Sequence, residues 1–286
     1  MNLAHICDCH VHIYEPDYPL AATATFTPPH APASAYREVQ RALGLGRVVV
    51  VQPTGYGFDN RCTLASVEQL GPQARAIAIA PADVSDAELD RLHAAGVRGI
   101  RFMMLAGGVL PWSSLGAIAA RIAPRGWHIN LQLDGRDLPL HEAMLARLPC
   151  RLVIDHIGKF LGPVHPDGDA VMALRRLLDG GACWVKLAAP YESSRDGPPS
   201  YADVVPLTRL LAQQYPERCL WASNWPHPNV VPTPDNASLL AWATDCMGDD
   251  AGRRRILVDN PGELYDFPTY GDEASPLPRP HESSAP

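Results

Sequence analysis

The sequence predicts an α/β protein that folds as a single (β/α)8 TIM-type barrel. Three observations lead to this fold. Short apolar segments alternate with helical patterns eight times along the chain, at fairly even spacing and with connections of a few residues. No Gly-x-Gly-x-x-Gly motif follows the first strand and no P-loop is present, so the marker of a dinucleotide-binding sheet is missing. Polar residues also stand at the ends of several apolar strands, as the catalytic mouth of a barrel requires.

Each predicted strand is a short apolar run bounded by glycine, proline or polar residues. The run at 47–53 is continuously apolar in its centre, which is typical of a parallel strand buried on both faces. The Pro-rich segment 16–32 follows the first strand, and long loops after a barrel strand usually help to form the active site. The predicted strands are 6–14, 47–53, 74–80, 97–104, 128–133, 151–156, 183–187 and 219–224.

Helical patterns with start and stop signals lie between these strands. Ser34 is expected to cap the first helix, and Ser85 with Glu88 forms a capping box for the third, which Gly96 ends. The predicted helices are 34–43, 60–70, 85–95, 114–124, 140–148, 169–178 and 202–214, with further helical segments from 237 to 265.

Length and composition fit one globular domain. The chain has 286 residues, of which 47% are hydrophobic, and its formal net charge is −7. No basic run, bilayer-length apolar stretch or signal-peptide pattern is present, so we expect no nucleic-acid partner, no membrane contact and a cytoplasmic location. Seven cysteines without a Cys-x-x-Cys pair indicate reduced, buried thiols. Residues 1–267 are expected to form the barrel and the Pro- and Ser-rich residues 268–286 a disordered tail. Nothing in the sequence indicates an oligomeric state.

Three strand ends carry the candidate chemistry. His10 and His12 lie two apart on the first strand, so both rings are expected to face the barrel interior. His156 ends the sixth strand and Asn224 ends the eighth. Because the strands of a barrel are parallel and the first neighbours the eighth, these side chains are expected to meet at one mouth.

The motifs around these residues resemble the amidohydrolase superfamily. Asp-x-His-x-His at 8–12, Asp-His-x-Gly at 155–158 and Trp-Pro-His at 225–227 carry the resemblance, which runs to about Phe267. The branch that it resembles is the 2-pyrone-4,6-dicarboxylate lactonase-like group of sugar-lactone and pyrone lactonases. Further motifs of the same resemblance are 51–53, 96–102, 154–158, 184–186 and 258–261.

Position 224 departs from the hydrolytic members of this group. Those members carry an aspartate there, which acts as general base toward water, whereas this chain has Asn224. An amide has no basic lone pair at neutral pH and cannot take a proton from water. The box at 224–227, with segments 155–160 and 191–195, is similar to the galactarolactone isomerase type. That type converts a sugar-diacid (aldarate) 1,5-lactone into its 1,4-lactone, and the nucleophile is a hydroxyl of the substrate itself.

The resemblance and the residue types together suggest roles for the site. His10, His12 and His156 would polarise the lactone carbonyl or hold its oxyanion, and Asn224 would orient a hydroxyl. The expected ligand is a small lactone carboxylate. The candidates to bind it are Arg101, Lys159 and Arg195 for the carboxylate, Tyr56, Gln132 and Tyr191 for hydroxyls, and His227.

Ordinary structural roles remain open for several of these residues. Arg101 can pair with acids at the barrel rim, Lys159 can be a solvated charge there, and Gln132 can fill the core as a polar residue. Lys186 stands at a strand position where many superfamily relatives place a modified, metal-bridging lysine. The resemblance does not imply that role in this branch.

A metal is not expected. His10, His12 and His156 could ligate one zinc ion with an open position, and this is the alternative. Metal-dependent superfamily members usually add a carboxylate at the end of the eighth strand. Asn224 removes that ligand, and the branch includes metal-independent enzymes.

Three functions follow in order of preference. The first is a metal-independent isomerase that converts an aldarate 1,5-lactone to its 1,4-lactone by intramolecular transesterification. The second is a lactone hydrolase with another base, such as neutral His12 or His227, or with a metal-bound hydroxide. The third is a non-catalytic carboxylate-binding protein that has lost its base.

Overall fold

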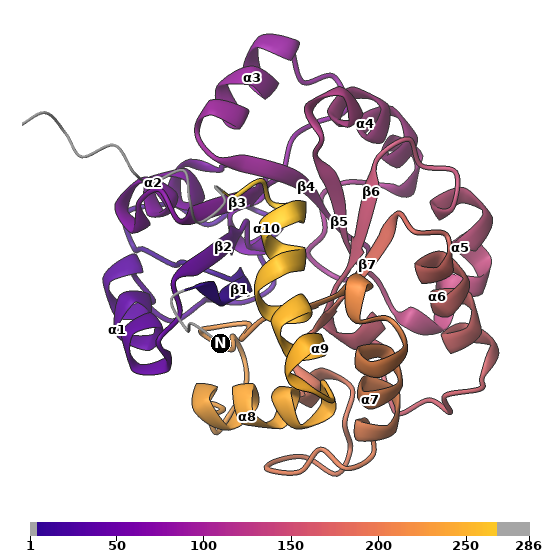
Figure 1. Cartoon of the computed structure of the whole chain (residues 1–286). Helices are drawn as coiled ribbons and strands as arrows, with labels where there is room; N and C mark the ends of the chain where they lie inside the picture. Colours follow the sequence, from indigo (N-terminus) through magenta and orange to yellow (C-terminus); the bar gives the residue numbers. More distant parts are fainter. Residues whose placement is uncertain (1–4, 268–286) are drawn as a thin grey trace, which may run out of the picture.

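The computed structural model describes residues 5–267. Eight parallel strands form one sheet in the order β1 to β8, and helices surround it (Figure 1). This arrangement confirms the predicted (β/α)8 barrel. The strands are β1 (Cys7–Val11), β2 (Arg47–Val51), β3 (Ala74–Ala78), β4 (Val97–Met103), β5 (His128–Gln132), β6 (Arg151–Ile154), β7 (Cys183–Leu187) and β8 (Cys219–Trp221).

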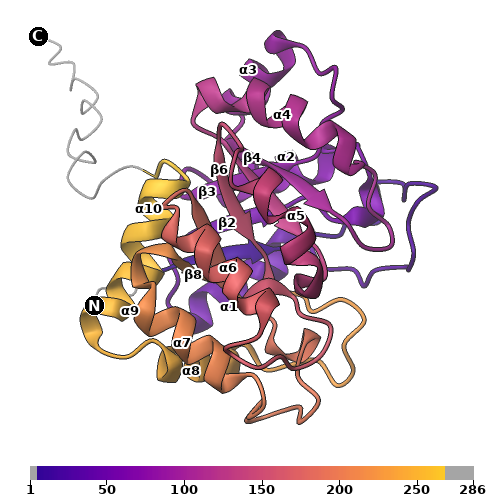
Figure 2. The same cartoon turned by 90° about the vertical axis from the view of Figure 1, so that its right-hand side faces the viewer.

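The helices of the outer layer each follow a strand, as the alternating sequence pattern predicts. The side view in Figure 2 shows them packed along the outside of the strands. They are α1 (Ala33–Leu43), α2 (Arg61–Leu70), α3 (Asp86–Ala94), α4 (Leu115–Ile122), α5 (Leu138–Leu145), α6 (Asp169–Asp179), α7 (Val205–Gln214) and α8 (Asn236–Cys246).

The last helical segments lie across one end of the barrel. They are α9 (Asp250–Arg254), a π-helical turn (Arg255–Asp259) and α10 (Asn260–Leu264), drawn in yellow and orange in Figure 1. Tyr265 and Phe267, which follow α10, pack against inward-facing strand residues such as Cys7 and Cys9. The other end of the barrel is therefore the one available to a ligand.

Hydrogen bonds close the barrel between β1 and β8, just beyond the end of β8. The backbone N–H of Asn224 donates to the carbonyl of His10 (3.0 Å), and that of His12 donates to the carbonyl of Trp225 (2.8 Å). These bonds hold Asn224 beside the two histidines, although the three residues come from opposite ends of the sequence.

An irregularity in β1 decides where its polar side chains go. Residues two apart in a regular strand share a face, but the register of β1 with β2 shifts between Asp8 and Val11. The Asp8 carboxylate lies outside the barrel, where the hydroxyl of Tyr36 on α1 donates to it (3.0 Å). His10 lies inside, 3.1 Å from the ammonium of Lys186. The shift therefore frees His10 for the site while Asp8 ties β1 to the outer layer.

Several predicted boundaries need correction. The first strand ends at Val11 rather than at residue 14, and Tyr14 instead makes an isolated antiparallel bridge with Ala31 that ties together the ends of the long loop. The cap predicted for Ser34 is wrong, because α1 begins at Ala33 after Pro32 without a side-chain cap. α5 begins at Leu138, two residues before the predicted start, since Pro139 fits the first turn of a helix.

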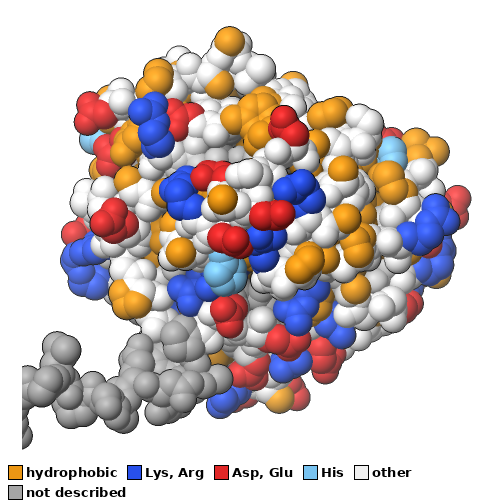
Figure 3. All heavy atoms as spheres, turned by 90° about the horizontal axis from the view of Figure 1, so that it is seen from above, with side chains coloured by type: hydrophobic (Ala, Val, Ile, Leu, Met, Phe, Trp, Pro, Cys, Tyr) orange, Lys and Arg blue, Asp and Glu red, His pale blue; other side chains and the backbone are white. Residues whose placement is uncertain are grey.

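The remaining sequence expectations concern a helix cap, the cysteines, membrane spans and surface charge. The Ser85 hydroxyl accepts from the Glu88 N–H (3.1 Å), as the predicted capping box requires. All seven cysteines are free, and six of them are buried. Among residues 5–267, no helix is long and apolar enough to cross a membrane. On the face shown in Figure 3, basic and acidic side chains are interspersed. The tail predicted to be disordered lies outside the described residues.

Candidate active site

A cavity of about 360 Å³ opens at the carboxyl end of the strands. Most of the site residues predicted from the sequence line it. They are His12, Arg101, Gln132, His156, Lys159, Tyr191 and Asn224. The sequence prediction that these strand ends meet is therefore right for this set.

His10 on β1 and His12 just after it form a hydrogen-bonded pair, and their tautomers follow from their partners. His12 Nδ1 lies 2.8 Å from the carbonyl of Val51, which can only accept, so Nδ1 carries the proton. His12 Nε2 then accepts from His10 Nε2, at 3.1 Å. His10 Nδ1 is left as an acceptor, and it faces the Lys186 ammonium at 3.1 Å. Burial lowers the pKa of His12 to about 3 and holds that of His10 well below its ordinary value, so both rings are neutral.

Lys186 connects these histidines to β5 and β6. Its side chain is 0% exposed, and besides His10 its ammonium contacts Asn130 Oδ1 (2.6 Å) and Asp155 Oδ1 (3.1 Å). Asn130 Nδ2 in turn donates to Asp155 Oδ2 (2.8 Å). Burial opposes ionisation of Asp155, but the charge of Lys186 holds its pKa well below the usual range. The ammonium is thus within hydrogen-bond distance of two neutral acceptors, and its buried charge is paired with the Asp155 carboxylate.

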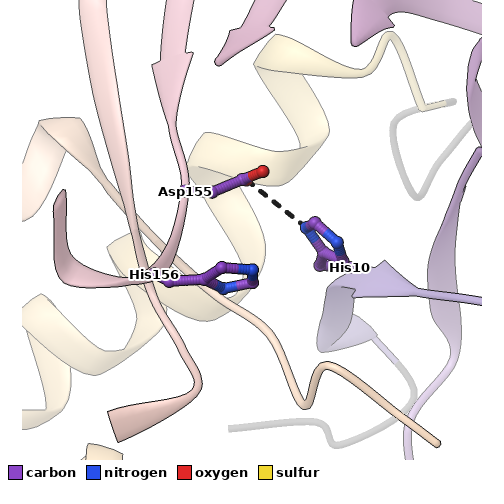
Figure 4. A group of neighbouring side chains, drawn as sticks. All are labelled: His10, Asp155 and His156. Carbon is purple, nitrogen blue, oxygen red and sulfur yellow. Dashed lines mark ion pairs between the residues drawn. The ribbon is translucent and has the colours of Figure 1, made fainter. Parts of the chain in front are cut away.

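His156 lies opposite His10 across this network, as Figure 4 shows, with Asp155 beside both rings. The ring centroids of His10 and His156 are 4.9 Å apart. His156, Ile157 and Lys159 have φ values of 54°, 57° and 44°, in the left-handed region that non-glycine residues rarely adopt. The backbone after β6 is therefore strained, and the strain coincides with two residues that line the cavity.

Arg101 is a cation in the cavity wall that has no carboxylate partner among residues 5–267. It is 4% exposed. Its Nη1 donates to the carbonyl of Gln52 (2.8 Å) and its Nη2 to Gln132 Oε1 (2.7 Å), both of them uncharged. A buried guanidinium held by neutral acceptors is suited to an anionic ligand. The predicted alternative, an Arg101 paired with acids at the rim, is wrong.

Lys159 and Glu192 form an ion pair on one wall of the cavity. The Lys159 ammonium donates to Glu192 Oε2, and the two side chains follow the neighbouring strands β6 and β7. Burial and the nearby charge of Arg101 lower the pKa of Lys159 to about 8. Lys159 is thus neither a solvated charge nor a cation without a partner.

Asn224 has its amide group in the cavity wall and belongs to a chain of polar side chains. Its Nδ2 donates to the hydroxyl of Tyr191 (2.9 Å), which also contacts His227 Nδ1 (2.9 Å). His227 Nε2 is held by Asn236 Oδ1 (2.9 Å). Asn224 Oδ1 is buried without a hydrogen-bond partner, so one amide acceptor remains for a ligand hydroxyl.

Three other predicted site residues do not line the cavity, and His10 lies beneath His12. The Tyr56 hydroxyl bonds to both the N–H and the carbonyl of Glu15, in a neighbouring hollow. Arg195 is exposed, because its backbone N–H and the adjoining turn are bonded to Asp203. His227 stands behind Tyr191. Tyr56 and Arg195 therefore lie outside the lining of this cavity, and their contacts with substrate stay a prediction.

Sequence reasoning missed Glu192 and Asn130, and it did not predict that Lys186 connects His10 to Asp155. Glu192 directly follows Tyr191, which is a predicted site residue in the segment after the seventh strand. That position is the signal by which Glu192 could be found. Asn130 and Lys186 alternate with apolar residues on β5 and β7, and a polar residue on a barrel strand that points inward needs a partner.

The residues present do not fit a divalent cation. His10, Asp155 and His156 have candidate ligand atoms within 4.8 Å of one another. However, the Lys186 ammonium lies next to both His10 and Asp155, so its charge would oppose a cation there. The zinc alternative at His10, His12 and His156 also lacks a carboxylate at position 224, where Asn224 directs its N–H toward Tyr191.

The fold and the site define a (β/α)8-barrel enzyme with a cavity suited to a small anion. The amidohydrolase family model matches residues 7–267, and the chain belongs to that family. A D-galactarolactone isomerase from Agrobacterium fabrum is 38% identical over 263 residues, 90% of each chain. A 2-pyrone-4,6-dicarboxylate hydrolase from Comamonas testosteroni is 34% identical over 271 residues, 90% of this chain and 89% of the other. An apo crystal structure of an Agrobacterium tumefaciens protein has a TM-score of 0.88 at 37% identity, covering 92% of this chain and 96% of that one.

The buried histidines predict how stability depends on pH. His10, His12, His128 and His156 all have a lowered pKa because burial disfavours the imidazolium. Below pH 6.5, the pKa of histidine in the unfolded chain, the unfolded chain binds more protons than the folded one. The free energy of unfolding therefore decreases as the pH is lowered, by up to about 1.4 kcal/mol per pH unit for each histidine. Burial raises the pKa of Asp8 from 3.8 to about 6, which acts in the opposite direction but only for one group.

Urea unfolding at pH 7.5 and at pH 5.5 measures this dependence. The midpoint is expected to be lower at pH 5.5, and the variant His165→Asn should show the same difference because His165 is exposed. A midpoint at pH 5.5 equal to or above that at pH 7.5 would contradict the neutral, buried state of these rings.

Proposed function

We propose that this protein is an isomerase that converts an aldarate 1,5-lactone into its 1,4-lactone by intramolecular transesterification. The observation that carries the proposal is the amide of Asn224 in the cavity wall, at the position where a water-activating carboxylate would stand. A hydroxyl of the substrate needs no water activation, and its attachment to the same molecule supplies much of the rate. The similarity to a protein named D-galactarolactone isomerase supports the same reaction.

Arg101 is the proposed anchor for the substrate carboxylate. It offers N–H groups in a planar fork, and its two neutral acceptors leave its charge uncompensated. Gln132 holds the fork in place and lines the cavity, so it also contacts sugar hydroxyls in this proposal. Anchoring the free carboxylate at this wall fixes the orientation of the lactone ring.

Neutral His156 is proposed to stabilise charge on the carbonyl oxygen. His156 lines the cavity, whereas both ring nitrogens of His12 are already bound, Nδ1 to the carbonyl of Val51 and Nε2 to His10. Hydrogen bonds aimed at the oxygen of a tetrahedral intermediate are worth several kcal/mol when they are fixed in advance. The strained backbone at His156 is consistent with such a fixed donor.

The proposal includes no metal or other cofactor, a cytoplasmic location and a small lactone carboxylate as ligand. The misfit of the histidine cluster to a divalent cation supports the first point. A lactone hydrolase is the second candidate, because relatives 34% and 33% identical are named as hydrolases of a pyrone dicarboxylate and of 4-sulfomuconolactone. That reading requires a base other than Asn224.

The proposed reaction is tested by NMR of the purified, chelator-treated protein with galactaro-1,5-lactone. Conversion to the 1,4-lactone faster than the spontaneous rate is the expected result. Open-chain diacid as the enzymatic product would overturn the proposal in favour of the hydrolase.

Arg101→Met should weaken substrate binding. Loss of the charge-assisted hydrogen bonds corresponds to about 1.5–3 kcal/mol, so KM is expected to rise roughly 10- to 100-fold, with Arg101→Lys intermediate. Steady-state kinetics on the 1,5-lactone measures the effect. The matched control is Arg195→Met, whose side chain is exposed away from the cavity and which should behave as wild type. The opposite pattern would place the carboxylate at Arg195.

Asn224→Asp should increase hydrolysis at the expense of isomerisation. A carboxylate at this place can take a proton from water, and a positioned general base supplies at least about 10²-fold. The ratio of diacid to 1,4-lactone, measured by NMR, reports the change. Asn229→Asp adds the same charge elsewhere on the cavity wall and should leave the ratio unchanged. Equal ratios in wild type and Asn224→Asp would contradict our account of Asn224.

A further inference from the structure

Transesterification leaves one requirement that Asn224 cannot meet. The attacking hydroxyl must lose a proton, and the ring oxygen that leaves must gain one. In the change from a 1,5- to a 1,4-lactone these two oxygens sit on neighbouring carbons, so groups close together can serve both. This reasoning rests on the proposed function.

His12 and the deeper acid Asp155 are already bound to other groups, and His156 is assigned to the carbonyl oxygen. His12 uses Nδ1 on the Val51 carbonyl and Nε2 on His10. Asp155 is 0% exposed and bound to Lys186, and it does not line the cavity. Burial raises the pKa of Tyr191, so it stays a neutral phenol at neutral pH and is not available as a base.

Glu192 is the carboxylate that remains. Among the residues described as lining the cavity it is the one acidic side chain, and it is 25% exposed. The ammonium of Lys159, 9% exposed and also in the lining, is in contact with it. A base and an acid thus stand next to each other on one wall, at the ends of adjacent strands.

We propose that Glu192 and Lys159 form the proton shuttle of the isomerisation. Glu192 takes the proton of the attacking hydroxyl as its oxygen bonds to the lactone carbonyl carbon. The intermediate collapses by breaking the bond from that carbon to the original ring oxygen, which takes a proton from the Lys159 ammonium. The proton on Glu192 then passes to the Lys159 amine across their hydrogen bond, and the pair is restored without water or a further reagent.

The two transfers help each other. Once Glu192 is protonated, the Lys159 ammonium has lost the anion that stabilised it and gives up its proton more readily. Burial already lowers the pKa of Lys159 to about 8, which is near the range of an effective general acid at neutral pH.

Glu192→Gln tests the shuttle. It keeps the size of the side chain and a hydrogen-bond acceptor but removes the base, so kcat on the 1,5-lactone is expected to fall about 10²-fold or more. The Kd for the 1,4-lactone, measured by calorimetry, should stay within about threefold of wild type. Glu192→Asp keeps a carboxylate and should retain more activity than Glu192→Gln. Glu142→Gln, which removes a carboxylate paired with Arg176 on the outer helices, is the control and should be unaffected.

The pair is expected to act as a unit. Lys159→Met should lose a similar factor in kcat, and the double variant should be little slower than the slower single variant. Multiplied losses in the double variant would indicate separate roles and overturn the shuttle. Wild-type kcat in Glu192→Gln would overturn it as well, while leaving the proposed function intact. A wild-type protein that forms no 1,4-lactone would instead overturn the proposed function.

Discussion

The ion pair between Lys186 and Asp155 lies inside the barrel below the cavity, and the arrangement of the site depends on it. Lys186 fixes the acceptor side of His10, and through His10 it fixes the proton between the two histidines. Asp155 in turn is held by Asn130 as well as by the ammonium, so neither buried charge lacks a partner. Removing one member of such a pair typically costs about 3–5 kcal/mol, because the other is left uncompensated. The same pair keeps a positive charge where a divalent cation would otherwise have its ligands.

In the cavity wall above this ion pair, the two cations Arg101 and Lys159 have different partners. Arg101 has only neutral partners and is free to hold an anion, whereas Lys159 is paired with Glu192 and is free to exchange a proton. The different proposed roles of Arg101 and Lys159 follow from the groups around them, and residue type alone does not predict them.

Local sequence signals were sufficient to predict the barrel and the main strand-end residues. Apolar runs separated by helical patterns fixed the order of the elements, and parallel strands must end at one mouth, which brought His12, His156 and Asn224 together. The side-chain partners could not be predicted in the same way. The irregularity in β1 sends Asp8 and His10 to opposite faces, and a register shift leaves no pattern in a single sequence. Arg195 likewise depends on a turn held by Asp203, which residue types alone do not reveal.

The central claim is that the lactone carbonyl is attacked by a hydroxyl of the substrate and never by water. The most direct measurement is to run the conversion in water enriched in oxygen-18 and to analyse the 1,4-lactone by mass spectrometry. Intramolecular transfer predicts no label in the product, because every oxygen comes from the substrate. A route through hydrolysis and ring closure would place label in the lactone carbonyl of part of the product, and its appearance at the rate of product formation would contradict the account.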